Sequence, residues 1–354
     1  MDKWRVFYNR AVRFLVIMVV VSLHAAAQQW FVQTSGLDTN LRGISVRHYS
    51  VKGKRAFAVW ASGSNGIILL STDTGSTWKR LHITGGDDLD FRDIEGFDAD
   101  TAYVMSSGEG EKSRIYKTTD GGKTWNLQYT DKRPGFFLDS IACDSKLHCV
   151  ALSDPVEGKF LVLRTDDGEH WRELPRDKMP AILSGEGAFA ASGTAIAYCG
   201  KGQIFFGTGG GRTARVFHSK DQGQTWRVGD APIASGNASS GIFSVACNGH
   251  SVVAVGGDYK EPARAQRVAA YSTDFGETWR AAEVLPGGYR SAVAHDSNGN
   301  FVAVGPNGSD VSLDGGAKWK SQDVQNFNAV SFARNEGWAA GPKGTIARSG
   351  THHK

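Results

Sequence analysis

Cysteine, proline and long apolar runs are all scarce in this sequence of 354 residues. Four cysteines are too few for a disulfide-built scaffold, and the lack of a Cys-x-x-Cys motif argues against a zinc or thioredoxin-like site. Nine prolines against 44 glycines favour many short strands and tight turns. Because the sequence has no dinucleotide fingerprint, no metal-ligand cluster and no helical periodicity of any length, we expect no cofactor, no metal and no helical domain.

The four cysteines still have partners to consider. Cys143 and Cys149 flank a short segment, so if the two strands there form a hairpin, their thiols lie across from each other in a disulfide. The sequence leaves open whether Cys199 and Cys247 pair.

The N-terminus has the order of a signal peptide: basic residues, an apolar stretch from Phe14 to Leu23, then Ala25, Ala26 and Ala27. The apolar stretch is far shorter than the roughly 20 residues that span a bilayer. We therefore predict cleavage after Ala27, export to the periplasm or beyond the cell, and no membrane span in the mature chain.

The charge of the mature chain excludes one class of partner. Residues 1–27 hold four basic residues and one acid, so the formal charge falls from +4 to +1 without them. A nearly neutral domain lacks the clustered basic face of nucleic-acid-binding proteins. We expect no nucleic-acid partner, and we expect a monomer.

Six copies of one motif dominate the rest of the chain. In each, Asp, Gly and Trp stand two, four and seven positions after the first residue; the copies span 71–78, 118–125, 164–171, 219–226, 272–279 and 312–319. Their aspartates, Asp73, Asp120, Asp166, Asp221, Asp274 and Asp314, are 47, 46, 55, 53 and 40 residues apart. Recurrence at this spacing is typical of propeller blades.

The residue types of the motif suit a structural hairpin turn. The Asp accepts hydrogen bonds from backbone N–H groups, the Gly supplies a positive φ, and the Trp wedges into the sheet as the next strand starts. In the third copy, Arg164 and His170 replace the usual hydroxyl residues, so we expect a looser turn there.

The flanks of the motifs alternate in the period of two that half-buried strands show, as in 56–61 and 252–255. Each unit therefore supplies four strands. Three further strands follow the sixth motif, and a lone strand precedes the first one at Trp30–Ser35. We predict an all-β protein: one seven-bladed β-propeller of four-stranded antiparallel blades over residues 28–350, closed by the N-terminal strand in the last blade, with a tail at 351–354.

The repeats resemble those of the BNR, or Asp-box, superfamily, which includes sialidases and xyloglucan-active glycosidases. The sequence pattern of Phe327–Phe332 and Gly337–Ile346 is most similar to that of the photosystem II stability and assembly factors and their exported bacterial relatives. The resemblance covers residues 29–350 and implies the fold more than the function. Sialidases of this superfamily are six-bladed and carry an Arg-Ile-Pro motif, which this sequence lacks.

Functional residues are expected on the face opposite the Asp boxes, which we call the channel-mouth face. There the chain runs into each first strand and from each second strand to the third, free of the repeat constraint. The candidate ligand-binding residues are Arg42, Arg92, Asp93, Asp139, Glu186, Arg212, Asp258, Tyr259, Tyr289, Arg290, Asn307 and Lys343. Arg42, Arg92 and Arg290 are predicted to share one anionic ligand. The Gly-rich run 207–213 is expected to be a mobile loop, and 256–267 a lid or partner contact.

Three functions compete for this face. The leading hypothesis is an exported binding or assembly factor that captures a polypeptide segment or an acidic glycan. The alternative is a glycoside hydrolase or lyase that uses two of Asp93, Asp139, Asp154, Glu186 and Asp258. The third is a structural interaction module, in which these charges simply pair with each other.

Overall fold

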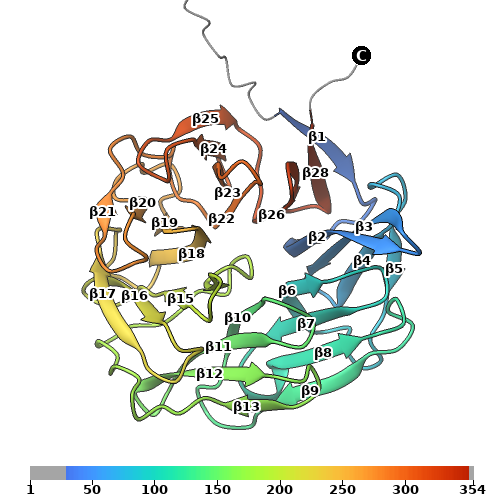
Figure 1. The fold of residues 1–354 in the computed structure, drawn as a ribbon, viewed down its shortest axis with the longest axis horizontal. Helices are drawn as coiled ribbons and strands as arrows, with labels where there is room; N and C mark the ends of the chain where they lie inside the picture. Colours follow the sequence, from blue (N-terminus) through green and yellow to red (C-terminus); the bar gives the residue numbers. More distant parts are fainter. Residues whose placement is uncertain (1–28, 351–354) are drawn as a thin grey trace, which may run out of the picture.

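The computed structural model describes residues 29–350, so the predicted leader and the tail lie outside the described residues. The described chain is a ring of seven four-stranded antiparallel sheets around a central channel (Figure 1). The predicted fold class is therefore confirmed. No helix within residues 29–350 is long and apolar enough to cross a bilayer.

Blades 1 to 3 follow one another along the chain, each running outward from the channel. Their strands are β2 (Leu41–Val51), β3 (Lys54–Gly63), β4 (Ile67–Ser71) and β5 (Lys79–Leu81); β6 (Asp90–Gly96), β7 (Ala102–Ser107), β8 (Arg114–Thr118) and β9 (Asn126–Thr130); and β10 (Leu138–Cys143), β11 (Cys149–Val156), β12 (Lys159–Thr165) and β13 (Trp171–Glu173). A single 3-10 turn, η1 (Gly110–Lys112), lies between β7 and β8.

Blades 4 to 6 repeat the order, and blade 7 is composite. Their strands are β14 (Ile196–Tyr198), β15 (Ile204–Gly207), β16 (Ala214–Ser219) and β17 (Arg227–Ala231); β18 (Ser240–Asn248), β19 (Ser251–Asp258), β20 (Ala269–Ser272) and β21 (Arg280–Ala281); β22 (Ala292–His295), β23 (Phe301–Gly305), β24 (Gly308–Ser312) and β25 (Lys320–Asp323); and β26 (Ala329–Ala333), β27 (Glu336–Ala340), β28 (Thr345–Gly350) and β1 (Gln29–Thr34).

The N-terminal strand closes the ring. β1 pairs antiparallel with β28 along its whole length, from Gln29 opposite Gly350 to Thr34 opposite Thr345. Figure 1 shows the two ends of the described chain side by side in this blade. The ring of Trp30 is buried beside Phe327, with 5.5 Å between ring centroids, and its Nε1 donates to Ser309 Oγ of blade 6. The seam is therefore both paired and packed.

The hydrophobic core lies between the blades rather than at the centre of the ring. Seven clusters of buried side chains fill the seven spaces between blades, because each sheet is apolar on both faces. Trp60 of blade 1, for example, is fully buried and donates through Nε1 to the Asp98 carbonyl of blade 2. Every blade needs both neighbours, so closure matters for the whole ring.

Five Asp boxes share one hydrogen-bonded turn. In the second, Thr118 Oγ1 donates to Asp120 Oδ1 and accepts from the Gly122 N–H, while Asp120 Oδ1 accepts from the Thr124 N–H at 2.9 Å. These bonds hold the pKa of Asp120 down at about 2, chiefly through Thr124. The same pattern recurs at Asp73, Asp221, Asp274 and Asp314.

The third box corrects two predictions. Asp167, not Asp166, accepts from the backbone N–H groups of the turn, and Thr165 takes the hydroxyl position. Asp166 instead pairs with Arg164 and with Arg172. The turn is one residue shorter between Asp and Gly than the others, yet its hydrogen bonds are complete, so it is not looser.

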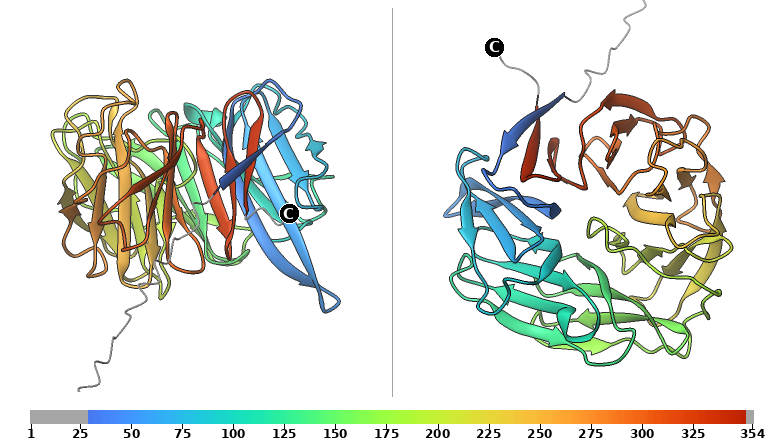
Figure 2. Two further views of the ribbon diagram at one scale, coloured as in Figure 1. Left: turned by 90° about the horizontal axis from the view of Figure 1, so that it is seen from above. Right: turned by 180° about the vertical axis from the view of Figure 1, so that it is seen from behind.

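Two disulfides join strand ends at the Asp-box face. Cys143 and Cys149 stand opposite each other in the β10–β11 hairpin and are bonded, with 4.1 Å between their Cα atoms. Cys199 follows β14 and is bonded to Cys247 of β18, so this second disulfide joins blade 4 to blade 5. The β2–β3 hairpin projects past the other blades on this face (Figure 2).

Candidate functional site at the channel mouth

The innermost strands of four blades carry an irregularity at the same place. In the pairing of each first strand with its second, the register skips one residue near the channel-mouth end: Arg42 in β2, Arg92 in β6, Asp139 in β10 and Phe243 in β18. A bulged residue leaves the ladder and its side chain is re-aimed. The bulges therefore take two arginines, one aspartate and one phenylalanine out of the regular alternation of side chains between the two faces of a strand.

The two bulged arginines meet around Asp90, at the start of β6. The Arg92 Nε donates to Asp90 Oδ2 at 2.7 Å, and the Arg42 Nε lies 3.9 Å from Oδ1. The Arg42 Nε is buried and makes no hydrogen bond within the described chain. Burial, and then the charge of Arg92, lowers the pKa of the Arg42 guanidinium. Two cations thus share the Asp90 carboxylate, and the charge of Arg92 also acts on the buried Asp139.

A segment of blade 4, residues 187–193, crosses the channel beneath these arginines. Its Ala190 carbonyl accepts from Arg92 of blade 2, and its Ser192 Oγ donates to the Ser291 carbonyl beside blade 6. Blades 2 and 6 are not neighbours of blade 4, so the segment must reach into the centre of the ring, as the loop beside β15 does in Figure 1. We call residues 187–193 the crossing segment.

Glycines anchor the crossing segment. Gly187 and Gly209 exchange two backbone hydrogen bonds, and a Cβ on Gly209 would lie 2.4 Å from the Gly241 Cα. No side chain fits between these backbones. The Gly-rich run 207–213 therefore includes a close-packed anchor at Gly209.

Four aromatic rings form a ledge next to the arginines. The bulged Phe243 stacks on Phe189 of the crossing segment at 3.9 Å and meets Tyr289 edge-on at 4.8 Å. Tyr259 contacts Phe243 at 6.1 Å and is 48% exposed. Tyr289 lies close enough to Arg42 for the two groups to act on each other's pKa. The ledge and the arginine pair thus form one continuous surface, which we call the mouth site.

The third bulged residue, Asp139, borders the mouth site from blade 3. Burial raises the pKa of Asp139, and the charge of Asp154 adds to this effect. The Asp139 Oδ2 is buried without a hydrogen-bond partner within residues 29–350. Asp154 accepts from the Ala188 N–H of the crossing segment, and burial raises its pKa to about 6.

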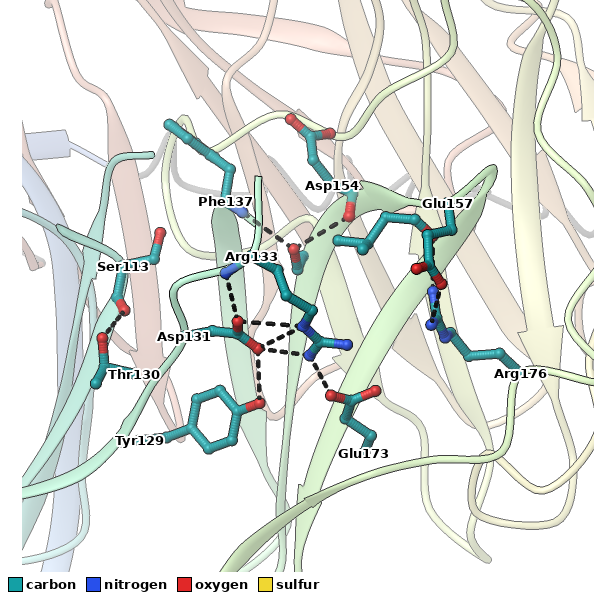
Figure 3. A network of polar contacts seen from close by, with 12 residues as sticks. Ser113, Tyr129, Thr130, Asp131, Arg133, Phe137, Asp154, Glu157, Glu173 and Arg176 are labelled. Carbon is teal, nitrogen blue, oxygen red and sulfur yellow. Dashed lines mark hydrogen bonds and ion pairs between the residues drawn. The ribbon is translucent and has the colours of Figure 1, made fainter. Parts of the chain in front are cut away.

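Figure 3 shows Asp154 beside the network around Arg133, which joins Asp131 and Glu173 in the link between blades 2 and 3. The carboxylate of Asp154 points away from that network, and the contact drawn at Asp154 ends on its backbone oxygen. The Arg133 network therefore holds the link in place without neutralising Asp154.

Arg290 does not belong to the mouth site. It is 1% exposed, its Nε donates to Asp310 at 2.6 Å, and its NH1 group donates to Asn307 at 2.6 Å. The Asn307 amide is also bound, to the carbonyls of Pro262 and Gly287. The shared anion site for three arginines is thus reduced to Arg42 and Arg92, because Asp310 already neutralises Arg290.

Glu186 is likewise occupied. Its carboxylate accepts from the Nε of Arg215 at 2.8 Å, from Thr208 Oγ1 and from the Leu183 N–H. The sequence placed Glu186 at the start of a first strand, but β14 begins only at Ile196, after the crossing segment. Glu186 therefore holds the base of that segment instead of facing a ligand.

The remaining candidates lie at the rim or inside the channel. Arg212 and Lys343 are exposed, and Asp258 accepts from the Asn237 amide and the Lys260 N–H. The 256–267 loop is tied to blade 6, because the Pro262 carbonyl accepts from the Tyr289 N–H. Asp93 follows the Arg92 bulge and points into the other half of the channel.

Sequence reasoning missed three members of the mouth site: Asp90, Phe189 and Phe243. Phe189 had no signal, since the crossing segment has no counterpart in the other blades.

Comparisons with known proteins agree with this architecture. Residues 22–185 match the family model described as Photosynthesis system II assembly factor YCF48, and residues 270–281 match the BNR/Asp-box repeat. The first match includes the three blades that supply Arg42, Arg92 and Asp139.

Individual proteins are similar over most of the chain. Photosystem II assembly lipoprotein Ycf48 of Synechococcus sp. (strain CC9902) is 23% identical over 300 residues, which is 81% of this chain and 80% of that protein. The solved structure "YCF48 bound to D1 peptide" has a TM-score of 0.61 at 17% identity and covers 91% of this chain and 97% of its own. Virginiamycin B lyase from Staphylococcus aureus reaches a TM-score of 0.62 at 13% identity, with coverage of 91% and 100%.

Proposed function

We propose that this chain, a seven-bladed Asp-box propeller that resembles the photosystem II assembly factors, is an exported binding or assembly factor that captures a polypeptide segment at its mouth site. The observation that carries the proposal is the meeting of two bulged arginines with a ledge of four aromatic rings. The solved structure of a YCF48 with a D1 peptide adds to it, since that similar propeller holds a peptide.

The two halves of the mouth site suit two parts of a peptide. Arg42 and Arg92 share the Asp90 carboxylate, and the Arg42 Nε has no hydrogen-bond partner within residues 29–350, so a carboxylate, either a C-terminus or an acidic side chain, would supply one. In the ledge, Phe243 and Tyr289 are buried and support the partly exposed Phe189 and the exposed Tyr259, which offer apolar area for a neighbouring side chain. Aromatic residues and arginine are also the residue types that dominate binding energy at protein interfaces.

An exported location fits the same proposal. The two disulfides are of the kind that persist in oxidising compartments, and the sequence predicts a cleaved leader. The similar Synechococcus protein is named a lipoprotein, which is a class of exported protein.

The glycosidase alternative has less support from the carboxylates. Glu186 is paired with Arg215, Asp258 is held by amides, and Asp139 is 1% exposed next to Asp154. A two-carboxylate mechanism needs an open cleft with acid groups about 5 to 9.5 Å apart on both sides of the sugar. Assay of Asp139→Asn for loss of polysaccharide cleavage is the direct test of this alternative.

Peptide selection tests the proposal. A random peptide library with free C-termini would be selected on the purified protein, and the best peptide titrated by fluorescence anisotropy. We expect Arg42→Ala and Arg92→Ala to weaken binding at least about tenfold, the effect of losing a charge-assisted hydrogen bond. Tyr259→Ala should weaken it too, through lost apolar contact.

The matched control is Arg80→Ala, an exposed arginine on β5 at the outside of the ring. Comparing the peptide with its C-terminal amide tells whether the bound carboxylate is the terminus or a side chain. If no peptide is selected, or if Arg42→Ala and Arg80→Ala behave alike, the proposal is wrong. Selection of an acidic glycan on an array with the same Arg42 dependence would replace the peptide by a glycan.

A further inference from the structure

The half of the channel nearer the Asp boxes holds a cavity of about 330 Å³, at the small end of the range of ligand pockets. It is lined by the second halves of all seven innermost strands, none of which contributes its bulged residue. The mouth site therefore lies on the other side of the crossing segment. Binding in this cavity is independent of peptide capture at the mouth site, so it does not rest on the proposed function.

The crossing segment closes the inner end of the cavity. Ser140 Oγ donates to the Gly193 carbonyl at 2.6 Å from blade 3, and Ser192 Oγ donates to the Ser291 carbonyl at 2.8 Å near blade 6. The outer end carries polar groups in contact with solvent, since His295 is exposed and the Arg47 side chain is 39% exposed. The cavity is thus a blind funnel that opens at the Asp-box face.

The funnel wall is about half apolar and half polar. Its aliphatic part comes from five different blades, through Ile94, Ile141, Ile196, Val245 and Val293. This part of the wall can take the hydrocarbon stem of a ligand. The charged end of a ligand then has to find its partner at the carboxyl groups of β6.

Asp93 is the deep carboxyl group. It is 4% exposed, and its Oδ2 accepts from the Ile141 N–H at 2.7 Å. The Ile94 N–H also interacts with this carboxyl group, and no cation pairs with it within residues 29–350, although Asp93 lines the cavity. Gly193 packs directly against the carboxyl group, because a Cβ there would lie 2.1 Å from Oδ1. A buried carboxyl group that has backbone N–H partners but no cation therefore lines the funnel.

Glu95, two residues further along β6, is the second carboxyl group. Its only charged partner in the described chain is Arg47, at 3.5 Å, whose Nε is already bound to the Gly96 carbonyl. The other titratable groups on the wall are His295 and Tyr198. Arg47 is thus the one charged partner that the described residues offer to these two carboxyl groups. Burial raises the pKa of both acids, that of Glu95 to about 7, which is the response expected of carboxylates short of cations.

We propose that this funnel binds one primary alkylammonium group, as at the end of a lysine side chain on a polypeptide, with Asp93 and Glu95 as its anionic partners. The ammonium supplies a cation for Asp93, which has none within the described residues, and three N–H donors for the two carboxyl groups. The four-carbon stem lies along the aliphatic wall, where long cationic side chains commonly pack. A planar guanidinium fits less well, since Arg47 already occupies the wider outer end.

Calorimetric titration at pH 7 with three probes tests the proposal. N-acetyl-lysine-methylamide presents the ammonium on a peptide unit, 1,5-diaminopentane presents it as a free amine, and N-acetyl-norleucine-methylamide has the stem without the charge. We expect the norleucine probe to bind at least about tenfold more weakly than the lysine probe, because it leaves the carboxylates uncompensated. Tighter binding of the lysine probe than of the diamine indicates a peptide source, and the reverse a free amine.

Variants locate the binding. Glu95→Gln and Asp93→Asn should each weaken the lysine probe by about tenfold, whereas Asp88→Asn, an exposed acid that does not line the funnel, should not change it. Glu95→Gln keeps the test valid if Asp93→Asn does not fold. Binding should also release protons into the buffer, seen as a dependence of the measured heat on buffer ionisation enthalpy.

Three results would overturn the proposal: no binding of either amine, equal binding of the lysine and norleucine probes, or unchanged binding in Glu95→Gln. None of these three results tests peptide binding at the mouth site, because the mouth-site residue Arg42 does not line the funnel. Conversely, a failed peptide selection at the mouth site leaves these outcomes readable.

Discussion

The Asp-box face and the channel-mouth face are the two ends of the same strands, but they are built in opposite ways. At the Asp-box face, five turns repeat one hydrogen-bond pattern and a sixth shortens it by one residue. At the channel-mouth face, bulges at Arg42, Arg92, Asp139 and Phe243 break the ladders, and the crossing segment occurs in one blade only. The repeated face secures each blade, while the irregular face gathers different side chains from several blades.

Opening the ring should affect both faces at once and give the largest effect. Deleting residues 29–34 removes β1, exposes the edge of β28 and takes away the buried Trp30. We expect a loss greater than the about 3–5 kcal/mol that truncating one buried Trp costs, with aggregation through the open edge. Deletion of residues 351–354 is the control. An unchanged melting temperature for the 29–34 deletion would contradict the role of β1 in closure.

The next largest effect should come from Arg290, and it separates structural from binding arginines on the channel-mouth face. Because Arg290→Ala leaves Asp310 buried without its partner, we expect a loss of about 3–5 kcal/mol in urea unfolding. Arg42→Ala, with a side chain in partial contact with solvent, should cost about 1 kcal/mol or less. If Arg290→Ala and Arg42→Ala lower the free energy of unfolding by the same amount, the distinction between a structural and a binding arginine is wrong.

The channel acids should make stability depend on pH. The folded pKa of Glu95, about 7, lies above its ordinary value of 4.5, so folding favours the protonated form and wild-type stability should fall as pH rises from 4.5 to 7. Asp93, Arg47 and His295 face the same cavity, and burial also raises the pKa of Asp93, which adds to this pH dependence.

Glu95→Gln removes that penalty. We expect the variant to be more stable than wild type by about 1–2 kcal/mol at pH 8, a conservative value because a fifth of the side chain still contacts solvent. At pH 4 the two proteins should unfold alike. A variant that is less stable at pH 8 would show that Glu95 is held ionised by Arg47.

The smallest effect should come from a single Asp box. Thr118→Ala removes the hydroxyl that binds both Asp120 and the Gly122 N–H, and we expect a loss of about 1–2 kcal/mol by thermal or urea unfolding. The neighbouring Thr119→Ala is exposed and serves as the matched control. Peptide binding at the mouth site should be equal in both variants. Loss of binding in Thr118→Ala alone would place function on the Asp-box face.

The sequence predicted the fold and the box turns well because both depend on local chemistry. A turn needs its own Asp, Gly and hydroxyl within eight residues, and blade spacing follows from the repeat. The site was predicted less well because pairing partners come from distant segments. Nothing near Arg290 in the sequence shows that Asp310 neutralises it, and Glu186 and Arg215 are 29 residues apart.

By itself the sequence determined the number of blades, the closing strand and the positions of the turns. The blades and turns follow from the spacing of the repeats, and the closing strand follows from the three unmatched strands at the C-terminus and the one at the N-terminus. Only the tertiary structure decided which charges remain free. Register in the ladders moved Arg42, Arg92 and Phe243 out of their alternation, and the crossing segment divided the channel into a mouth site and a funnel. The crossing segment depends on close backbone approaches such as Gly209 of blade 4 against Gly241 of blade 5, which bring together residues from two different blades.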